Sequence, residues 1–297
     1  MVLTDAFRDG VLDWDVPEGR WAVYRFGASL TGKKNHPASP EATGLEVDKL
    51  DPDAMCAYLR HYLDMYRDAS GDMLGARGIR HLMVDSYESG AQNWTSRMQE
   101  EFLKRRGYDM TPWMPVLAGV IVGDAAKSES FLKDFRTTIA ELFSENFARI
   151  TDIVRAEYGM DGCFMESHEN GRVFVMDGMS VKKTALYPMS ACWVPGKVGA
   201  KDRVFEGMAD IRESASVAHI YGQNLVAAES LTSIGLARQA YSYHPENLKH
   251  TADLELACGV NRFVIHDSAH QPRDDKFPGL GLGVYGQWFN RHECWAE

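Results

Sequence analysis

Several features that would direct a protein to nucleic acid, a metal cluster or a disulfide framework are missing from this sequence of 297 residues. The formal net charge is -10 and no long run of lysine and arginine occurs, which argues against a nucleic-acid partner because phosphate binding needs a basic face. The five cysteines are far apart and form no C-x-x-C pair, so neither a zinc site nor a set of disulfides is indicated. Cys163 and Cys258 stand among apolar residues and are predicted to be small buried side chains.

Membrane, esterase and nucleotide-binding signals are also absent. No apolar stretch is long enough to span a membrane, and the first residues lack the basic and apolar parts of a signal peptide. No Gly-x-Ser-x-Gly elbow occurs, which lowers the expectation of an esterase. The glycine repeat Gly279–Gly283 is not followed by a helix-forming segment with Lys, Ser or Thr, so we expect no nucleotide loop there.

What the sequence does contain is an unusual stretch from His81 to Thr95. The apolar run Leu82–Val84 is too short for a helix and is typical of a buried strand. It ends in two acids, Asp85 and Glu88, followed by two amides and a tryptophan. In parallel α/β folds, ligands and catalytic groups lie at the C-terminal ends of the strands. Carboxylates, amides and aromatic rings together suit a sugar ligand, which offers hydroxyl groups and flat C–H faces.

The same pattern, an apolar run that ends in an ionisable residue, recurs three times. The runs are Cys163–Met165 before Glu166-Ser-His-Glu169, Leu225–Ala228 before Glu229-Ser230, and Arg262–Ile265 before His266-Asp267 with His270 close behind. One case alone carries little weight, since 25% of the residues are charged. Four cases together predict strands whose C-terminal ends meet at one shared site.

The rest of the chain predicts helices between these strands. The first part is rich in turn formers and contains one predicted strand, Trp21–Phe26. Predicted helices run from Asp51-Pro52 to about Asp68, from a Ser96–Gln99 capping box to Gly107, from Glu129 to Tyr158, from Phe205 to Tyr221, and from Pro245 to near Gly259. The order of strand and helix argues for parallel βαβ units in an α/β fold. Only four or five strands are evident, fewer than the eight that close a barrel.

The acids at the strand ends fit glycoside hydrolysis, which needs one protonated and one ionised carboxyl group. Glu88, Glu166 and Glu229 are the best-placed glutamates, and Asp85 is close behind. Further candidates for contact with a sugar are the tyrosine, amides and tryptophan after the first strand, a second tryptophan and three histidines: Tyr87, Gln92, Asn93, Trp94, Trp193, His168, His266 and His270. The three histidines leave a transition-metal site open as an alternative, whereas His81 is expected only to begin a strand.

Several blocks resemble glycoside hydrolase family 106, the α-L-rhamnosidase-like enzymes. The most specific is Asp85-Ser-Tyr-Glu-Ser-Gly-Ala-Gln-Asn-Trp-Thr95. Others, in the same order along the chain, are Pro17-Glu-Gly-Arg-Trp21, Gly44-Leu-Glu-Val-Asp-Lys49, Glu101–Asp109, Ala218-His-Ile-Tyr-Gly222, Val226-Ala-Ala-Glu-Ser230, Gly259-Val-Asn-Arg-Phe263 and Phe289-Asn-Arg291. Together they cover most of the sequence.

The resemblance implies a (β/α)8 TIM-barrel-type catalytic domain, incomplete in this chain, and hydrolysis with inversion at the anomeric carbon. An N-terminal β/loop segment (1–45) would precede the barrel-type region (46–297). By motif, Glu88 would be the general acid, with Asp85 beside it, and Glu229 the base, although Glu166 remains open for that role. A Ca²⁺ ion is implied by the resemblance alone, and its ligands are not assigned.

One departure from the family concerns the segment where relatives carry Gly-Glu-Phe-Trp and this chain has Ser190-Ala191-Cys192-Trp193. The missing acid bears on substrate identity. The strand-end glutamates and the family blocks make an inverting α-L-rhamnosidase the leading hypothesis, acting on terminal rhamnose of polysaccharides or glycosides. A carbohydrate-binding relative without catalysis is the second hypothesis, and a metal-dependent hydrolase using the three histidines is the third.

Overall fold

The computed structural model describes residues 1–36, 38–167, 175–194, 201–233, 243, 245–266, 273 and 275, with the backbone alone for 201–206. Its centre is a parallel five-stranded sheet in the order β3-β4-β5-β6-β7. The strands are β3 (His81–Val84), β4 (Gly162–Met165), β5 (Tyr187–Cys192), β6 (Ala227–Ser230) and β7 (Arg262–Ile265). Strand order follows chain order, as consecutive βαβ units produce. The predicted α/β class is confirmed as a partial barrel; a closed eight-stranded barrel is not seen in the described residues.

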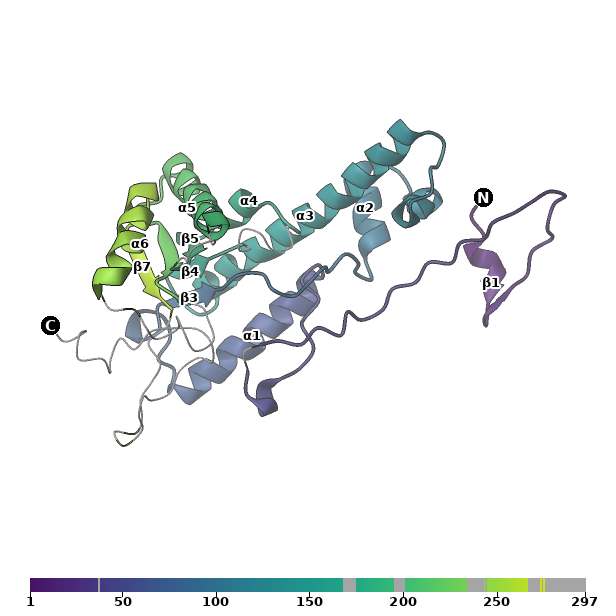
Figure 1. Cartoon of the computed structure of the whole chain (residues 1–297). Helices are drawn as coiled ribbons and strands as arrows, with labels where there is room; N and C mark the ends of the chain where they lie inside the picture. Colours follow the sequence, from purple (N-terminus) through teal and green to yellow (C-terminus); the bar gives the residue numbers. More distant parts are fainter. Residues whose placement is uncertain are drawn as a thin grey trace.

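Helices connect the strands and cover one face of the sheet (Figure 1). They are α1 (Pro52–Ala69), α2 (Met98–Arg106), α3 (Ala125–Ala156), α4 (Gly178–Lys182), α5 (Lys201–Tyr221) and α6 (Pro245–Cys258). Short 3-10 helices lie at Thr4–Ala6, Pro40–Ala42, Gly75–Arg77 and Thr111–Ala118, and a two-stranded ribbon pairs β1 (Phe7–Arg8) with β2 (Val11–Leu12). None of the helices in the described residues is long and apolar enough to cross a membrane.

The ends of helices α1 and α2 can be compared with the capping residues predicted from the sequence. The Asp51 carboxylate accepts hydrogen bonds from the amides of Asp53 and Ala54, and Pro52 opens α1, as predicted. Gly107 ends α2 with a φ of 78°, a conformation that favours glycine. The predicted capping box at Ser96 is wrong, because the N-cap of α2 is Arg97 and no side chain caps it.

The predicted strand Trp21–Phe26 is also wrong. These residues have no regular structure and belong to an N-terminal arm that extends away from the sheet (Figure 1). Trp21, Val23 and Tyr24 are exposed there. These residue types favour strands, but no neighbouring strand pairs with this segment in the described residues. A strand forms only where pairing and packing are available to it.

The main hydrophobic core lies between the sheet and the long helix α3. One face of α3 is buried in this core and carries Phe131, Phe135, Ile139, Leu142 and Phe143. Phe143 packs edge-to-face on another buried ring. Packing of this buried face holds α3 against β4 and so sets the position of the strand ends relative to the helix.

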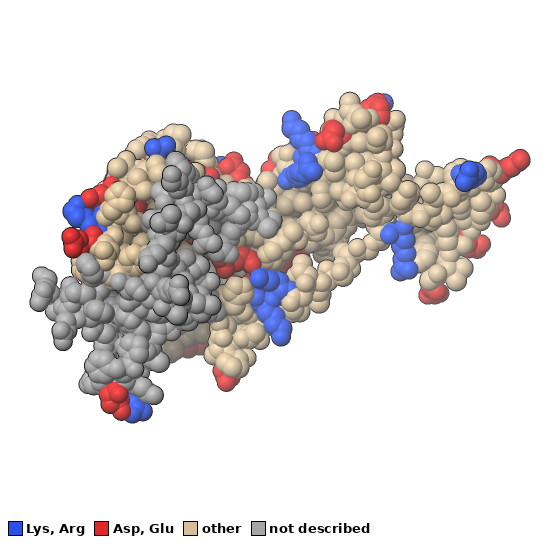
Figure 2. All heavy atoms as spheres, in the orientation of Figure 1, with Lys and Arg blue, Asp and Glu red and all other residues tan. Residues whose placement is uncertain are grey.

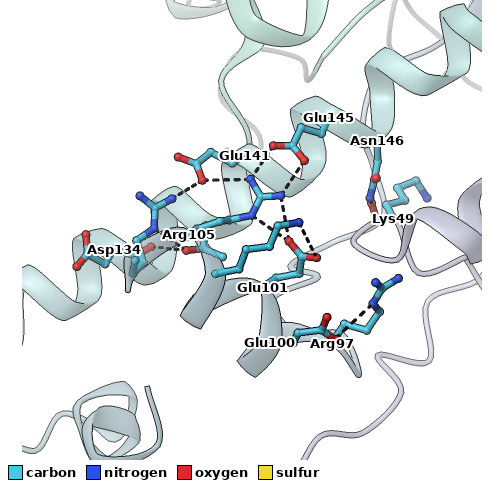
Figure 3. A network of polar contacts seen from close by, with 12 residues as sticks. Lys49, Arg97, Glu100, Glu101, Arg105, Asp134, Glu141, Glu145 and Asn146 are labelled. Carbon is cyan, nitrogen blue, oxygen red and sulfur yellow. Dashed lines mark hydrogen bonds and ion pairs between the residues drawn. The ribbon is translucent and has the colours of Figure 1, made fainter. Parts of the chain in front are cut away.

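The basic end of α2 is held by acids of α3 (Figure 3). Arg105 makes a forked pair with Glu145 at 2.6 and 2.7 Å, and Arg106 pairs with Glu141. The basic residues Arg105 and Arg106 are thus paired with acids of the neighbouring helix. On the face seen in Figure 2, basic and acidic side chains are interspersed.

Candidate active site

The period of two along each strand places the predicted site residues on one face of the sheet. On β3 and β4, the ring of His81 contacts that of Phe164, so odd residues of β3 and even residues of β4 share this face, here called the inner face. Asp85 and Glu166 continue these two series past the strand ends. Glu229 lies on β6 two residues after Ala227, which packs with Phe164. The inner face thus carries a layer of acids at its C-terminal edge.

The acids of this layer lie close together. Carboxylate oxygens of Asp85, Glu166 and Glu229 are all within 4.8 Å of one another. Asp85 is exposed, whereas Glu166 and Glu229 are buried. Glu229 was predicted to follow its strand but lies within it. The three acids thus form one cluster in which Asp85 is the member exposed to solvent.

Glu166 is the deepest of the three, with 2% of its surface exposed. Neither carboxyl oxygen has a hydrogen-bond partner among the described residues. Burial, together with the neighbouring charges of Glu229 and Asp85, raises the pKa of Glu166 well above its ordinary value. Burial and the two neighbouring carboxylates therefore favour the protonated form of this carboxyl group.

Two rings stand beside Glu229. The indole Nε1 of Trp193 donates a hydrogen bond of 2.6 Å to Glu229 Oε1. The Trp193 ring stacks on the His266 imidazole at a centroid distance of 6.1 Å and an angle of 10°. His266 Nδ1 lies 3.8 Å from the same Glu229 oxygen. The structure thus brings Trp193, Glu229 and His266 together. Glu229 and His266 were predicted to follow strands, whereas Trp193 was named only as a candidate for sugar contact.

A buried ion-pair group supports the site from the helix side. Lys182 on α4 is fully buried and lies 2.8 Å from Asp210 and 3.0 Å from Glu213 on α5. Burial would lower the pKa of Lys182, but the two carboxylates outweigh it and raise that pKa. The second oxygen of Asp210 accepts a hydrogen bond from the Ala191 amide at 2.9 Å. The charge of Lys182 also opposes the rise in the pKa of Glu166.

The segment after β3 is held by its own polar groups. The Tyr87 hydroxyl donates to the Gly90 carbonyl at 2.5 Å, and its ring is buried. The Gln92 amide accepts from the Lys49 backbone and donates to the Val47 carbonyl, both at 3.0 Å. Tyr87 and Gln92 therefore fix this loop to the segment before α1. A contact of either side chain with sugar stays a prediction.

Glu88 is half-buried on the same loop and is not a member of the three-acid group. Asn93 and Trp94 line a different cavity, of about 1150 Å³, between the N-terminal arm and the 3-10 helix Thr111–Ala118. The residues that surround the acids do not line that cavity. The stretch around Glu88 thus contributes Asp85 to the three-acid group, whereas Asn93 and Trp94 line the separate cavity.

The remaining predicted residues have mixed outcomes. His168 and His270 lie outside the described residues, so the three-histidine metal site is untested. His81 begins β3, as expected, and packs on aromatic rings. Cys163 and Cys258 are buried, as predicted, and burial raises the pKa of Cys163 to about 11.

Sequence reasoning missed Lys182, Asp210 and Thr232. Thr232 follows β6, is fully buried, and its hydroxyl contacts His266. Strand β5 was also missed, because Tyr187–Cys192 contains Pro188 and Ser190 and is followed by Trp193, so it lacks the ionisable residue that marks the other four runs. Nothing in the sequence marks Lys182 as a buried cation.

Comparison with known proteins gives the family context. The model of glycoside hydrolase family 106, described as alpha-L-rhamnosidase, matches residues 1–297. The solved structure of a rhamnosidase from Novosphingobium sp. PP1Y is 43% identical, with a TM-score of 0.83, over 99% of this chain and 28% of that one. A protein named "Putative beta-glucuronidase" from Formosa agariphila is 35% identical over 96% of this chain and 23% of its own length. The chain spans about a quarter of each of these relatives.

Proposed function

The chain belongs to glycoside hydrolase family 106, and from that membership we propose that it carries the catalytic centre of an α-L-rhamnosidase acting on terminal rhamnose of polysaccharides or glycosides. The single observation that supports this most is the layer of acids at the C-terminal edge of the sheet. Asp85, Glu166 and Glu229 meet there from three strands, where parallel α/β barrels hold their catalytic groups.

The proposed reaction is inversion by two carboxyl groups. Inverting enzymes keep these groups about 6.5–9.5 Å apart, which leaves room for the attacking water. The closest oxygens of Glu166 and Glu229 are within 4.8 Å, which is short for such a pair. The second partner of an inverting pair then comes from outside the cluster, and Glu88 is the candidate. We assign Glu88 as the general acid and Glu229 as the base that activates water.

Glu229 has the surroundings that suit a base. An indole N–H can only donate a hydrogen bond, so the contact from Trp193 holds one carboxylate oxygen in place. In this scheme Glu166 and Asp85 shape the pocket and bind the sugar hydroxyls.

The same three acids are the group that could hold the Ca²⁺ ion implied by the family. The fit is supported by the two buried oxygens of Glu166 that have no hydrogen-bond partner in the described residues, and by the all-oxygen donor set that Ca²⁺ prefers. Asp85, Glu166 and Glu229 would be its protein ligands. A bound Ca²⁺ would offset their mutual repulsion and orient sugar hydroxyls.

The test is hydrolysis of nitrophenyl α-L-rhamnoside, compared with nitrophenyl β-D-glucuronide because of the name carried by the Formosa relative. We expect release of nitrophenol from the rhamnoside, and a loss of about 10²–10⁴-fold in the Glu88→Gln and Glu229→Gln variants. Glu100→Gln, an exposed acid on α2, is the matched control and should retain the wild-type rate. Near wild-type rates in Glu229→Gln would refute the assignment of the base.

Sugar binding without turnover is the second candidate, and Ala191 favours it because the family resemblance implies an acid in this segment. Ala191 pairs with Glu229 across β5 and β6, so an acid there would have faced the same pocket. Calorimetric binding of L-rhamnose by a folded chain that releases no nitrophenol would support this candidate over the enzyme.

A further inference from the structure

The contact between Thr232 and His266 constrains where protons can be. Thr232 Oγ1 lies 2.7 Å from His266 Nδ1 and also 2.7 Å from the His266 backbone carbonyl oxygen. A hydroxyl group has one proton to donate and can accept from other donors. The carbonyl oxygen can only accept, so a contact of 2.7 Å with it requires the threonine proton.

It follows that the Thr232 oxygen acts as acceptor toward the imidazole. His266 Nδ1 must then carry a hydrogen. If the threonine donated to Nδ1 instead, the hydroxyl and carbonyl oxygens would face each other at 2.7 Å with no hydrogen between them. The Glu229 carboxylate, 3.8 Å from Nδ1, favours the same arrangement because it attracts the N–H dipole.

Thr232 is itself firmly placed. It is fully buried, and its carbonyl oxygen accepts a hydrogen bond of 2.8 Å from the Val194 amide. Leu231, the residue before it, has a φ of 67°, which a non-glycine residue adopts at a cost and which turns the chain after β6. The threonine hydroxyl therefore meets His266 as part of a fixed connection between the ends of β5, β6 and β7.

We propose that Thr232 is a positioning residue that holds neutral His266 as its Nδ1–H tautomer, so that Nε2 accepts a hydrogen bond from a hydroxyl group of the bound sugar. The second half of this inference rests on the proposed function. In a neutral imidazole with hydrogen on Nδ1, Nε2 has the lone pair. The His266 side chain is 28% exposed, so part of the ring is open to a ligand beside the acid layer.

The stacked neighbour supports a sugar as that ligand. Trp193 fixes the plane of the His266 ring and links it to Glu229 through the indole N–H. A hydroxyl group that donates to Nε2 would thus be placed next to the proposed base. Asp85, Glu166 and Glu229 also accept hydrogen bonds when ionised, so these groups together would recognise several donating hydroxyls of one sugar ring.

The tautomer can be measured without any activity. Long-range ¹H–¹⁵N correlation spectra of the chain labelled in histidine distinguish Nδ1–H from Nε2–H imidazoles, and His266→Gln assigns the signal. The spectra are recorded at about pH 8, above the ordinary histidine pKa of about 6.5. We expect the Nδ1–H pattern in the wild type and in Thr232→Ser, which keeps the hydroxyl. In Thr232→Val the pattern should shift toward Nε2–H, the form that prevails in isolated histidine.

An Nε2–H pattern in the wild type would overturn the inference. The same holds if Thr232→Val, folded by circular dichroism, keeps the wild-type pattern. If Thr232→Val fails to fold, the wild-type and Thr232→Ser spectra still decide the tautomer.

Ligand contact is tested by adding L-rhamnose to the same samples. We expect a change in the Nε2 resonance of His266. In rhamnoside hydrolysis, we expect Thr232→Val to lower the rate about 10-fold and Thr232→Ser to keep the wild-type rate. A 10-fold loss is the effect of about one hydrogen bond. An unchanged Nε2 resonance in a chain that hydrolyses rhamnosides would overturn the sugar contact. The Nδ1–H pattern in a chain that hydrolyses no rhamnoside would refute the proposed function and leave the role of Thr232 standing.

Discussion

Glu255 on α6 is a buried acid on the helix-covered side of the sheet, and its replacement by glutamine tests how that side is stabilised. Its side chain is fully buried and contacts the Ser230 hydroxyl of β6 at 2.6 Å. Ser230 also lies 2.9 Å from the Ala228 carbonyl oxygen. Because the serine has one proton, a protonated Glu255 completes both contacts by donating to Ser230.

The effect on stability follows from the pKa. Burial raises the pKa of Glu255 from 4.5 to about 7, against the opposing effect of the Ser230 hydrogen bond. Between these values the folded state holds a proton that the unfolded state has lost, so stability falls as pH rises from about 4.5 to about 7. At 1.36 kcal/mol per unit, this group costs on the order of 3 kcal/mol by the top of that range.

Glu255→Gln should remove this loss, because glutamine is neutral at every pH and its amide can donate to Ser230. We expect the variant to match the wild type near pH 4.5 and to exceed it by up to about 3 kcal/mol above pH 7. In urea that is a rise in midpoint of about 1 M, for a slope of about 3 kcal/mol per M. Unfolding curves recorded by circular dichroism from about pH 4.5 to about pH 8 measure it.

Glu246→Gln, an exposed acid on the same helix, is the matched control. It should change stability by less than about 1 kcal/mol, without a slope in this range. If the difference between Glu255→Gln and wild type is the same at both ends of the pH range, the buried acid is not the source of the slope and the reasoning is refuted.

Two further predictions concern packing. Lys182→Met leaves the buried Asp210 and the partly exposed Glu213 without their cation, and should cost about 3–5 kcal/mol in urea unfolding. A cost below about 1 kcal/mol would show that the ion pair contributes little. Phe143→Ala removes a fully buried ring from the core between α3 and the sheet and should lower the free energy of unfolding by about 3–5 kcal/mol. Leu103→Ala, at an exposed position, should lower it by less than about 1 kcal/mol, and equal effects would contradict the assignment of this core.

Much of the sheet could be predicted from the sequence, because parallel strands are short apolar runs with acids after them. The run Arg262–Ile265 is β7 as predicted, and β3 and β4 differ from their predicted runs by one residue. The alternation of residues along each strand does not by itself place Asp85, Glu166 and Glu229 on one face, because a shift of one residue in the register turns every side chain to the other face. Their closeness could not be predicted, because it depends on the register and curvature of the sheet.

The buried polar contacts beside the site could not be predicted from the sequence, for a different reason. Lys182 and Asp210 come from separate helices, and their burial is a result of packing. The Trp21–Phe26 prediction failed because strand propensity is a local property and pairing is not. Trp94, a predicted sugar contact, lines the cavity at the N-terminal arm, and its contact with a sugar stays a prediction.

A proton NMR time course with nitrophenyl α-L-rhamnoside and added Ca²⁺, run on the wild type and on Glu229→Gln, tests the central claim most directly. The account predicts β-L-rhamnose as the first-formed anomer and no product from the variant, as expected for an inverting rhamnosidase whose base is on β6. First formation of α-L-rhamnose would contradict inversion and indicate that a close pair such as Glu166 and Glu229 acts by retention. Undiminished product from Glu229→Gln would contradict the site itself.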